Sequence, residues 1–339
     1  ADVKEFTGKE PIQTAHFADV LARKDIDAVV IATPDHLHCS MLIDAIKAGK
    51  DVYVEKPLAM NMRELIRAYD TVKRSDRIVQ IGTQMRSYAN SGGAKKMIAA
   101  GELGAILKVE QVRNGFSPYW MSYGGNGFFG EKPAEADVDW KAFLGDRKAR
   151  PFDAAQYQGW YGFRDFSRGP HTNLMVHFID LVHYVTGASI PKRVVALGGT
   201  YRWKNEFDNP DSVEVALEYP EGFMVRYCTV FGTGAGNYAK WFGARGTLDA
   251  KSLSPSQKWV VSGQGSGEPN RIAGEVEVTP VETAHHMQNF LDCVRSRQQP
   301  IAPIEAGYAH SVAVIMADDA LTTGRRMLYD PAKRDVHAG

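Results

Sequence analysis

The stretch that decides the fold of this protein is Asp27-Ala28-Val29-Val30-Ile31-Ala32-Thr33-Pro34-Asp35-His36-Leu37-His38. It opens with a short apolar run rich in β-branched side chains, which predicts a buried parallel strand. Thr33 and Pro34 then end the strand and begin a loop. Because open α/β folds bind ligands where their parallel strands end, this stretch predicts a strand that leads into a binding loop.

Helical and strand patterns alternate after this stretch, and a further helix is expected before it, with Thr14 as its N-cap. The predicted helices are 14–24, 39–49 and 61–75, and the further predicted strands are 51–54 and 78–82. An alternation this regular predicts a doubly wound α/β domain, which we assign to residues 1–104.

The pattern changes after about residue 104. Strand-like runs now follow one another, separated by turn signals such as Pro220-Glu221-Gly222. The predicted strands are 107–113, 193–203, 212–218, 223–230 and 258–262, and the predicted helices are 282–297 and 305–325. Residues 105–339 are therefore expected to form an α+β domain around an antiparallel or mixed sheet.

The composition excludes several classes of partner. The 339 residues include 40 basic and 40 acidic side chains, so bulk charge favours neither nucleic acid nor a membrane surface. No apolar run approaches the roughly 20 residues of a membrane-spanning helix. The beginning of the sequence shows no signal-peptide pattern, and the compartment, cytoplasmic or periplasmic, stays open.

Neither the cysteines nor the histidines predict a metal site. The cysteines, Cys39, Cys228 and Cys293, are far apart and suit neither metal ligation nor a disulfide framework. Three histidines recur every six residues, at His171, His177 and His183. Six residues turn a helix by about 600°, so successive rings point in different directions.

Three motifs, each at the end of a predicted strand, carry a family resemblance. They are Ala32-Thr33-Pro34-Asp35-His36-Leu37-His38, Val54-Glu55-Lys56-Pro57-Leu58 and Gly82-Thr83-Gln84-Met85-Arg86. In this order they resemble the Gfo/Idh/MocA dehydrogenases, and the similarity continues through 139–145, 173–180, 290–295 and 328–331. The resemblance implies a Rossmann domain followed by a C-terminal domain with a large open, mainly antiparallel sheet. It also implies that the last helix, about 305–325, packs back on the first domain.

One element of the family pattern is missing from this sequence. Family members open with a strand, a Gly-x-Gly-x-x-Gly turn and a helix, whose N–H groups hold the dinucleotide pyrophosphate. The glycine clusters here, 124–127, 232–236 and 263–267, lie in the wrong part of the chain and are read as loops. We therefore expect an incomplete Rossmann domain with an exposed sheet edge, and a sequence that is a fragment; a protein that naturally lacks the unit is the alternative.

Lys56 and His177 are the predicted catalytic residues, with Asn173 beside His177. The resemblance implies that Lys56 hydrogen-bonds the hydroxyl that becomes a carbonyl, and a partly buried lysine has a lowered pKa suited to proton traffic. It also implies that His177 accepts the hydroxyl proton. Asn173 shares a helical face with His177 and stands where relatives usually have aspartate, so a charge that raises the histidine pKa is missing. A surface lysine and a packing histidine are the alternatives.

The resemblance further implies an NAD or NADP site and a sugar site. The expected cofactor-binding residues are Thr33, Pro34, Asp35, His38, Glu55, Lys56 and Gln84. The expected substrate-binding residues are Arg86, Trp160, Tyr161, Arg164, Asn173 and His177. Aromatic faces stack on sugar C–H groups, and arginine binds hydroxyls or carboxylates. Core packing is the alternative for each aromatic, and Arg86 has a contact to the neighbouring domain as its alternative.

The predicted function is therefore NAD(P)-dependent hydride transfer to or from a sugar, sugar derivative or polyol. One alternative is an NAD-dependent glycosidase that oxidises the sugar transiently. Another is a non-catalytic sugar-binding or assembly protein that has lost the cofactor. The expected partner is a small sugar or polyol, with no nucleic acid and no membrane, in a homodimer or homotetramer formed through the C-terminal sheet.

Overall fold

The computed structural model describes residues 3–116, 133–204, 207–250, 253–254 and 257–339. In its first part, β1 (Ala28–Ile31), β2 (Asp51–Val54) and β3 (Val79–Ile81) form a parallel sheet in that order. Helices α3 (His38–Lys47) and α4 (Met62–Lys73) follow β1 and β2, which confirms the predicted alternation. The strands β2 and β3 are fully buried, whereas β1 lies at the sheet edge.

Two short helices, α1 (Val3–Thr7) and α2 (Phe17–Ala22), precede β1. The predicted N-cap at Thr14 was wrong, because α2 begins later and His16 occupies the N-cap position. The Thr14 hydroxyl instead accepts a hydrogen bond from the His16 backbone N–H at 3.1 Å, which shapes the turn before the helix. On the exposed edge of the sheet, the Val30 side chain is 57% exposed.

The second part is built on a ten-stranded sheet in the order β11-β10-β9-β8-β4-β7-β6-β5-β12-β13. Every neighbouring pair is antiparallel except β4–β7, which is parallel. The strands that the sequence predicts are β4 (Ile106–Val112), β5 (Arg193–Gly199), β6 (Ser212–Glu218), β7 (Met224–Val230) and β10 (Val260–Ser262). The other strands are β8 (Tyr238–Gly243), β9 (Gly246–Ala250), β11 (Glu275–Glu277), β12 (Met327–Asp330) and β13 (Asp335–Ala338).

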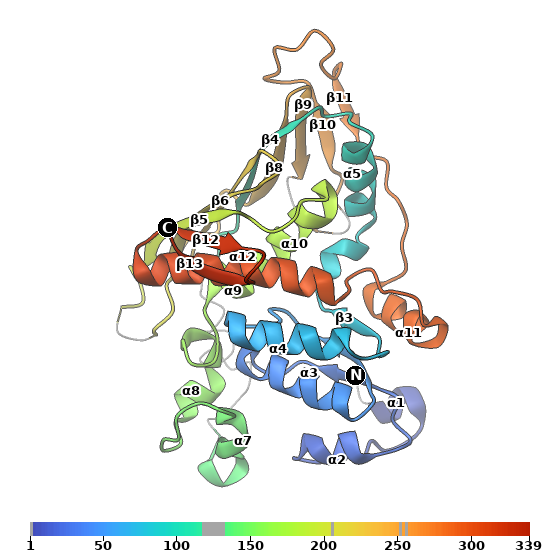
Figure 1. Cartoon of the computed structure of the whole chain (residues 1–339), viewed down its shortest axis with the longest axis vertical. Coiled ribbons are helices and arrows are strands. Elements are labelled where there is room, and N and C mark those ends of the chain that lie inside the picture. Colours follow the sequence, from blue (N-terminus) through green and yellow to red (C-terminus); the bar gives the residue numbers. More distant parts are fainter. Residues whose placement is uncertain (1–2, 117–132, 205–206, 251–252, 255–256) are drawn as a thin grey trace.

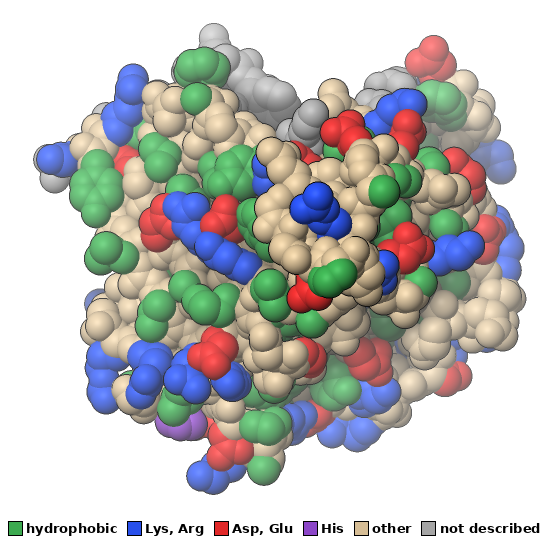
Figure 2. Space-filling model, turned by 90° about the horizontal axis from the view of Figure 1, so that it is seen from above, with side chains coloured by type: hydrophobic (Ala, Val, Ile, Leu, Met, Phe, Trp, Pro, Cys, Tyr) green, Lys and Arg blue, Asp and Glu red, His purple; other side chains and the backbone are tan. Residues whose placement is uncertain are grey.

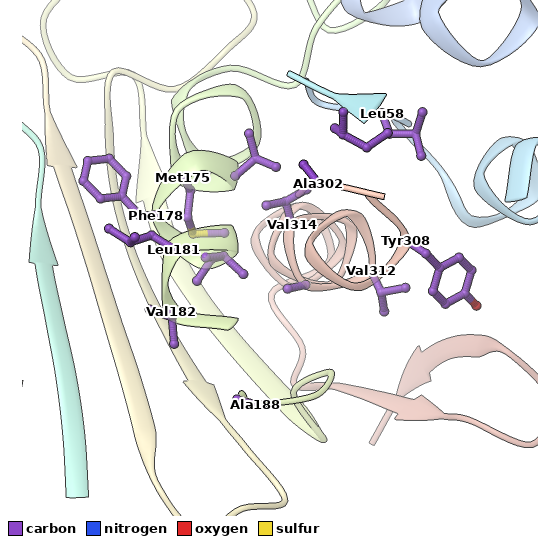
Figure 3. Packing of buried hydrophobic residues seen from close by; sticks show 14 of the residues in the cluster. Leu58, Met175, Phe178, Leu181, Val182, Ala188, Ala302, Tyr308, Val312 and Val314 are labelled. Atoms are coloured by element: carbon purple, nitrogen blue, oxygen red, sulfur yellow. The ribbon is translucent and has the colours of Figure 1, made fainter. Parts of the chain in front are cut away.

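Helices cover one face of this sheet (Figure 1). They are α5 (Ala89–Ala99), α9 (Pro170–Asn173), α10 (Met175–Thr186) and α12 (Ile304–Thr323). Helix α10 lies between the sheet and α12, and its buried Met175, Phe178 and Leu181 are in the main hydrophobic core (Figure 3). On its other side α12 packs against α4 and β3, so one helix joins the two domains.

The remaining elements lie at the margins of the two domains. They are α7 (Trp140–Leu144), α8 (Ala154–Gln158), α11 (His286–Ser296), η3 (Glu135–Asp137) and η4 (Trp160–Gly162), whereas the 3-10 turns η1 (Asp35–Leu37) and η2 (Gln84–Ser87) lie at the strand ends of the first sheet. Within the described ranges, no helix is long and apolar enough to cross a membrane. Figure 2 shows basic and acidic side chains mixed over the face that it displays.

Gly93 of α5 offers a test of how closely this helix packs. A Cβ built at Gly93 meets the carbonyl oxygen of Thr279 at 2.2 Å, so the backbone has no room for it. We expect Gly93→Ala to lower the free energy of unfolding by about 1–3 kcal/mol through overpacking. Urea denaturation measures the loss. Gly267→Ala is the control, because open space surrounds that position, and an equal effect of both substitutions contradicts the assigned packing.

Candidate active site

The parallel strands β1, β2 and β3 bring three loops to one edge of the first sheet. The His38 ring joins two of these loops: Nδ1 lies 2.7 Å from the Pro57 carbonyl oxygen and Nε2 lies 2.8 Å from that of Thr33. The His38 side chain is only 1% exposed. The structure therefore places His38 beneath the rim as a link between loops, while Thr33 and Pro34 remain partly exposed at the rim.

A continuous chain of hydrogen bonds crosses this edge. Lys56 Nζ donates to Asn173 Oδ1 at 2.7 Å and to the Asn173 carbonyl oxygen at 3.0 Å. Asn173 Nδ2 donates to both carboxylate oxygens of Asp35, at 2.9 and 3.1 Å. Ser167 Oγ donates to Asp35 Oδ2 at 2.7 Å. Three residues that the sequence singles out thus come together, with Ser167 as a member that it did not suggest.

Burial sets the electrostatics of this group. It lowers the pKa of Lys56, against the opposing charges of Asp35 and Glu55. It raises the pKa of Asp35, which the charges of His38 and Lys56 oppose. The pKa of His177 is held well below its ordinary value by burial first and by the charge of Lys56 second. His177 is therefore neutral near pH 7, and within the described residues its buried Nδ1 atom has no hydrogen-bond partner.

Glu55 and Gln84 complete the rim. Gln84 Nε2 donates to Glu55 Oε1 at 3.0 Å and to the Tyr53 hydroxyl oxygen at 3.1 Å. The other oxygen of Glu55 accepts from the Lys56 backbone N–H at 3.3 Å. A Cβ at Gly82 would lie 2.6 Å from the Glu55 carboxylate, so the glycine leaves room for this side chain. Glu55 is thereby oriented next to the backbone that carries Lys56.

The predicted substrate arginines are engaged in ion pairs with the protein's own carboxylates. Arg86 binds both oxygens of Asp180 at 2.8 Å. Arg164 Nη2 binds the two oxygens of Asp318 at 2.8 and 2.9 Å. Asp180 lies on α10 and Asp318 on α12, so each arginine connects its loop to a core helix. Arg86 thus contacts the neighbouring domain, which was the alternative to substrate binding that the sequence left open for this residue.

The two predicted substrate aromatics lie in η4. Their ring centroids are 5.7 Å apart, and Tyr161, which is 3% exposed, belongs to a small core with Trp203 and Phe231. Trp160 is partly buried and packs against this cluster and a neighbouring one. Core packing, the alternative considered for these side chains, is the arrangement observed for Tyr161.

A pocket of about 310 Å³ opens between the large sheet and α10. Its lining residues are Met85, Val112, Arg113, Phe178, Asn237, Tyr238, Leu253 and Ser254. Met85 and Phe178 directly follow Gln84 and His177 in the chain. The sequence did not suggest the polar lining from β8, because no strand was predicted between residues 230 and 258.

The rim loop also contains a buried histidine that predicts a pH dependence. The Nε2–H of His36 donates to the Phe143 carbonyl oxygen at 2.6 Å, and burial lowers its pKa from 6.5 to about 4. The folded state therefore favours the neutral ring, and this contribution to stability is complete above pH 6.5 and disappears as the pH falls toward 4. We expect His36→Gln to flatten the decline of unfolding free energy across that interval. Exposed His16 supplies the control, His16→Gln, and an unchanged slope in His36→Gln contradicts the assignment.

A Rossmann-type sheet with the partly buried Lys56 at its strand ends, joined to a domain with a large open sheet, is the arrangement of a two-domain nucleotide-binding oxidoreductase. The chain belongs to the oxidoreductase family with an NAD-binding Rossmann fold, whose model matches residues 2–83. The family's C-terminal alpha/beta domain matches residues 141–327.

Its relatives include enzymes of inositol and sugar metabolism. The scyllo-inositol 2-dehydrogenase (NAD(+)) of Bacillus subtilis is 25% identical over 297 residues, which cover 84% of this chain and 72% of the relative. The 2,7-anhydro-N-acetylneuraminate hydratase of Escherichia coli is 25% identical over a stretch that covers 60% of this chain and 45% of the hydratase. The structure of the WlbA dehydrogenase from Bordetella pertussis, in complex with NADH and UDP-GlcNAcA, has a TM-score of 0.70 at 20% identity. The match covers 96% of this chain and 86% of the WlbA chain, and it shows that the two proteins share a fold.

Proposed function

We propose that this protein is an NAD(P)-dependent oxidoreductase that converts a secondary alcohol of a sugar, sugar derivative or polyol to a ketone, or the reverse. The observation that carries this proposal is the geometry of Lys56. Its ammonium group has three N–H donors, of which Asn173 takes two, so one remains for a ligand at the strand-end rim. Family membership and the inositol dehydrogenase relative support the same chemistry.

The rim residues fit the nicotinamide half of such a cofactor. Thr33 and Pro34 after β1, Glu55 after β2 and Gln84 after β3 would hold it at the carboxyl ends of the strands, where this class of fold binds nucleotides. The unpartnered Nδ1 of His177 fits a ligand that carries a hydroxyl. When bound, NAD supplies the hydride acceptor or donor.

The protein's own residues would manage the proton. Lys56 donates its remaining N–H to the substrate oxygen and stabilises the negative charge that develops there. His177, which its lowered pKa keeps neutral, would accept the proton of the substrate hydroxyl. The reverse reaction returns the proton to the oxygen.

The proposal is tested by titrating NADH and NADPH with fluorescence detection, then by following NAD(P)H formation with inositols, aldoses and their acids. Saturable cofactor binding with net turnover supports the dehydrogenase. No binding at millimolar cofactor contradicts it and leaves a sugar-binding or assembly role. Cofactor binding with chemical conversion but no net NADH favours the transient-oxidation alternative.

We propose that copies of the chain associate through the outer face of the large sheet. Val195 and Leu197 of β5 and Met224 of β7 are 46%, 76% and 48% exposed there, next to the Glu214–Arg226 ion pair. A hollow of about 310 Å³ lies over the same strands. Light scattering tests this proposal: Leu197→Glu should convert an oligomer to monomers, and a wild-type monomer contradicts it.

A further inference from the structure

We propose that Asp35 is a positioning residue of this site, which acts on Lys56 through the side-chain amide of Asn173. The proposal rests on the proposed function, because Lys56 is taken there as the group that binds the substrate oxygen. It assigns to Asp35 a role toward the protein's own lysine rather than toward a cofactor.

Asp35, Asn173 and Lys56 form a line of hydrogen-bonded side chains that we call the relay, and the hydrogen-bond pattern defines both of its ends. Two bonds from Asn173 Nδ2 and one from Ser167 Oγ reach the carboxylate of Asp35, and every one of these donors brings a hydrogen. These bonds, with the charges of His38 and Lys56, favour the ionised, acceptor-only form of Asp35 against the burial that raises its pKa. Since the amide nitrogen only donates, its bond to Asp35 fixes the amide orientation and turns Asn173 Oδ1 toward Lys56 Nζ.

Burial makes this arrangement specific. Asp35 and Asn173 are 3% and 6% exposed, so bulk water does not compete for their hydrogen bonds. In such surroundings an anion polarises the amide that it binds, and the charge of Asp35 reaches Lys56 across one side chain. Two acceptors on Asn173 then fix two of the three ammonium hydrogens, and tetrahedral geometry directs the third.

Several charged or titratable groups surround this relay from different elements. Glu55 follows β2, His38 begins α3 and His177 lies on α10. Glu55 and Asp35 favour the ammonium form of Lys56, and the charge of Lys56 disfavours protonation of His177. These neighbours are present in every variant below, so changes within the series report on the Asp35–Asn173 pair alone.

The discriminating experiment exchanges the acid and the amide: Asp35→Asn, Asn173→Asp and the double variant. We expect kcat to fall about 10–100-fold in Asp35→Asn, the loss seen when an outer partner that orients a metal-ligating side chain is removed, with little change in NADH affinity. Asn173→Asp places two buried carboxylates in contact, which must share a proton, and it too should lose activity. The double variant restores one carboxylate and one amide, with Ser167 still able to donate, and should regain most of the kcat.

A readout independent of turnover separates this inference from the proposed function. Chemical acylation of Lys56 at a series of pH values, followed by mass spectrometry, reports the protonation of its amine. The apparent pKa of Lys56 should be lowest in Asp35→Asn, intermediate in the wild type and highest in the double variant, where the carboxylate lies directly against Nζ. A purely structural role for Asp35 does not produce this order.

Ser167→Ala is the matched control, because it removes one hydrogen bond to Asp35 and leaves its charge in place. It should preserve the pKa of Lys56 near the wild-type value, and circular dichroism verifies folding of all variants. Should Asp35→Asn fold and show wild-type kcat and Lys56 reactivity, the inference is overturned. A correct order of Lys56 pKa values in a protein without redox turnover instead refutes the proposed function and keeps Asp35 as the positioning residue.

Discussion

Lys56→Met is expected to lower kcat for sugar or polyol oxidation by about 10²–10⁴-fold, the usual contribution of a positioned proton-transfer group. Methionine has a similar length but no donor, so the substrate oxygen loses its hydrogen bond and the developing charge its counter-ion. Asn173 Oδ1 also loses the hydrogen bond that it accepts from Lys56 Nζ, although the hydrogen bonds from Asn173 Nδ2 to Asp35 remain. Steady-state kinetics, with NADH affinity measured separately by fluorescence, determine the size of the effect.

The matched control is Lys47→Met, at an exposed lysine near the end of α3. It should leave kcat unchanged. If the Lys56→Met protein binds NADH and turns over at the wild-type rate, Lys56 has no role in the reaction. Loss of cofactor binding together with activity would instead assign Lys56 to the cofactor site.

Asp180→Asn is expected to be the most destabilising of these substitutions, by about 3–5 kcal/mol, because it leaves a buried cation without its partner. The Asp180 side chain is fully buried and accepts from Arg86 twice at 2.8 Å and from His310 Nδ1 at 3.0 Å. Although burial opposes ionisation, Arg86 and His310 hold the pKa of Asp180 well below its ordinary value. The ion group joins η2, α10 and α12, so its loss weakens the contact between the two domains.

Urea denaturation followed by circular dichroism measures the loss, and Glu214→Gln provides the comparison. Glu214 pairs with Arg226 on the surface of the sheet, where an ion pair contributes about 0–1 kcal/mol. Equal stability changes in the two variants would show that burial of the Asp180 group does not matter. A second transition in Asp180→Asn alone would show that the two domains have become uncoupled.

Much of the first domain is predictable because its information is local. Within the apolar runs of β1 and β2 and the helical repeat of α4, the residues that form each pattern are only one to four positions apart in the chain. A periodic pattern in the sequence is recognised over this short range. In the second domain β5 and β6 were recognised in the same way. Strands β8 and β12 were missed, and each of them pairs with a strand that is distant in the sequence, β4 for β8 and β5 for β12.

By itself, the sequence determined that Lys56 follows a buried strand and that Asp35 lies in the loop after the preceding strand. It predicted one helix for Asn173 and His177, whereas α9 ends at Asn173 and α10 begins at Met175. Only the tertiary structure decided that these residues form one relay, and that Arg86 binds Asp180 instead of facing an open site. The reason is physical: Lys56 and Asn173 are 117 positions apart, and Asp35 and Asn173 are 138 apart. Their contact depends on how α10 and α12 pack against both domains, a long-range arrangement that no local pattern encodes.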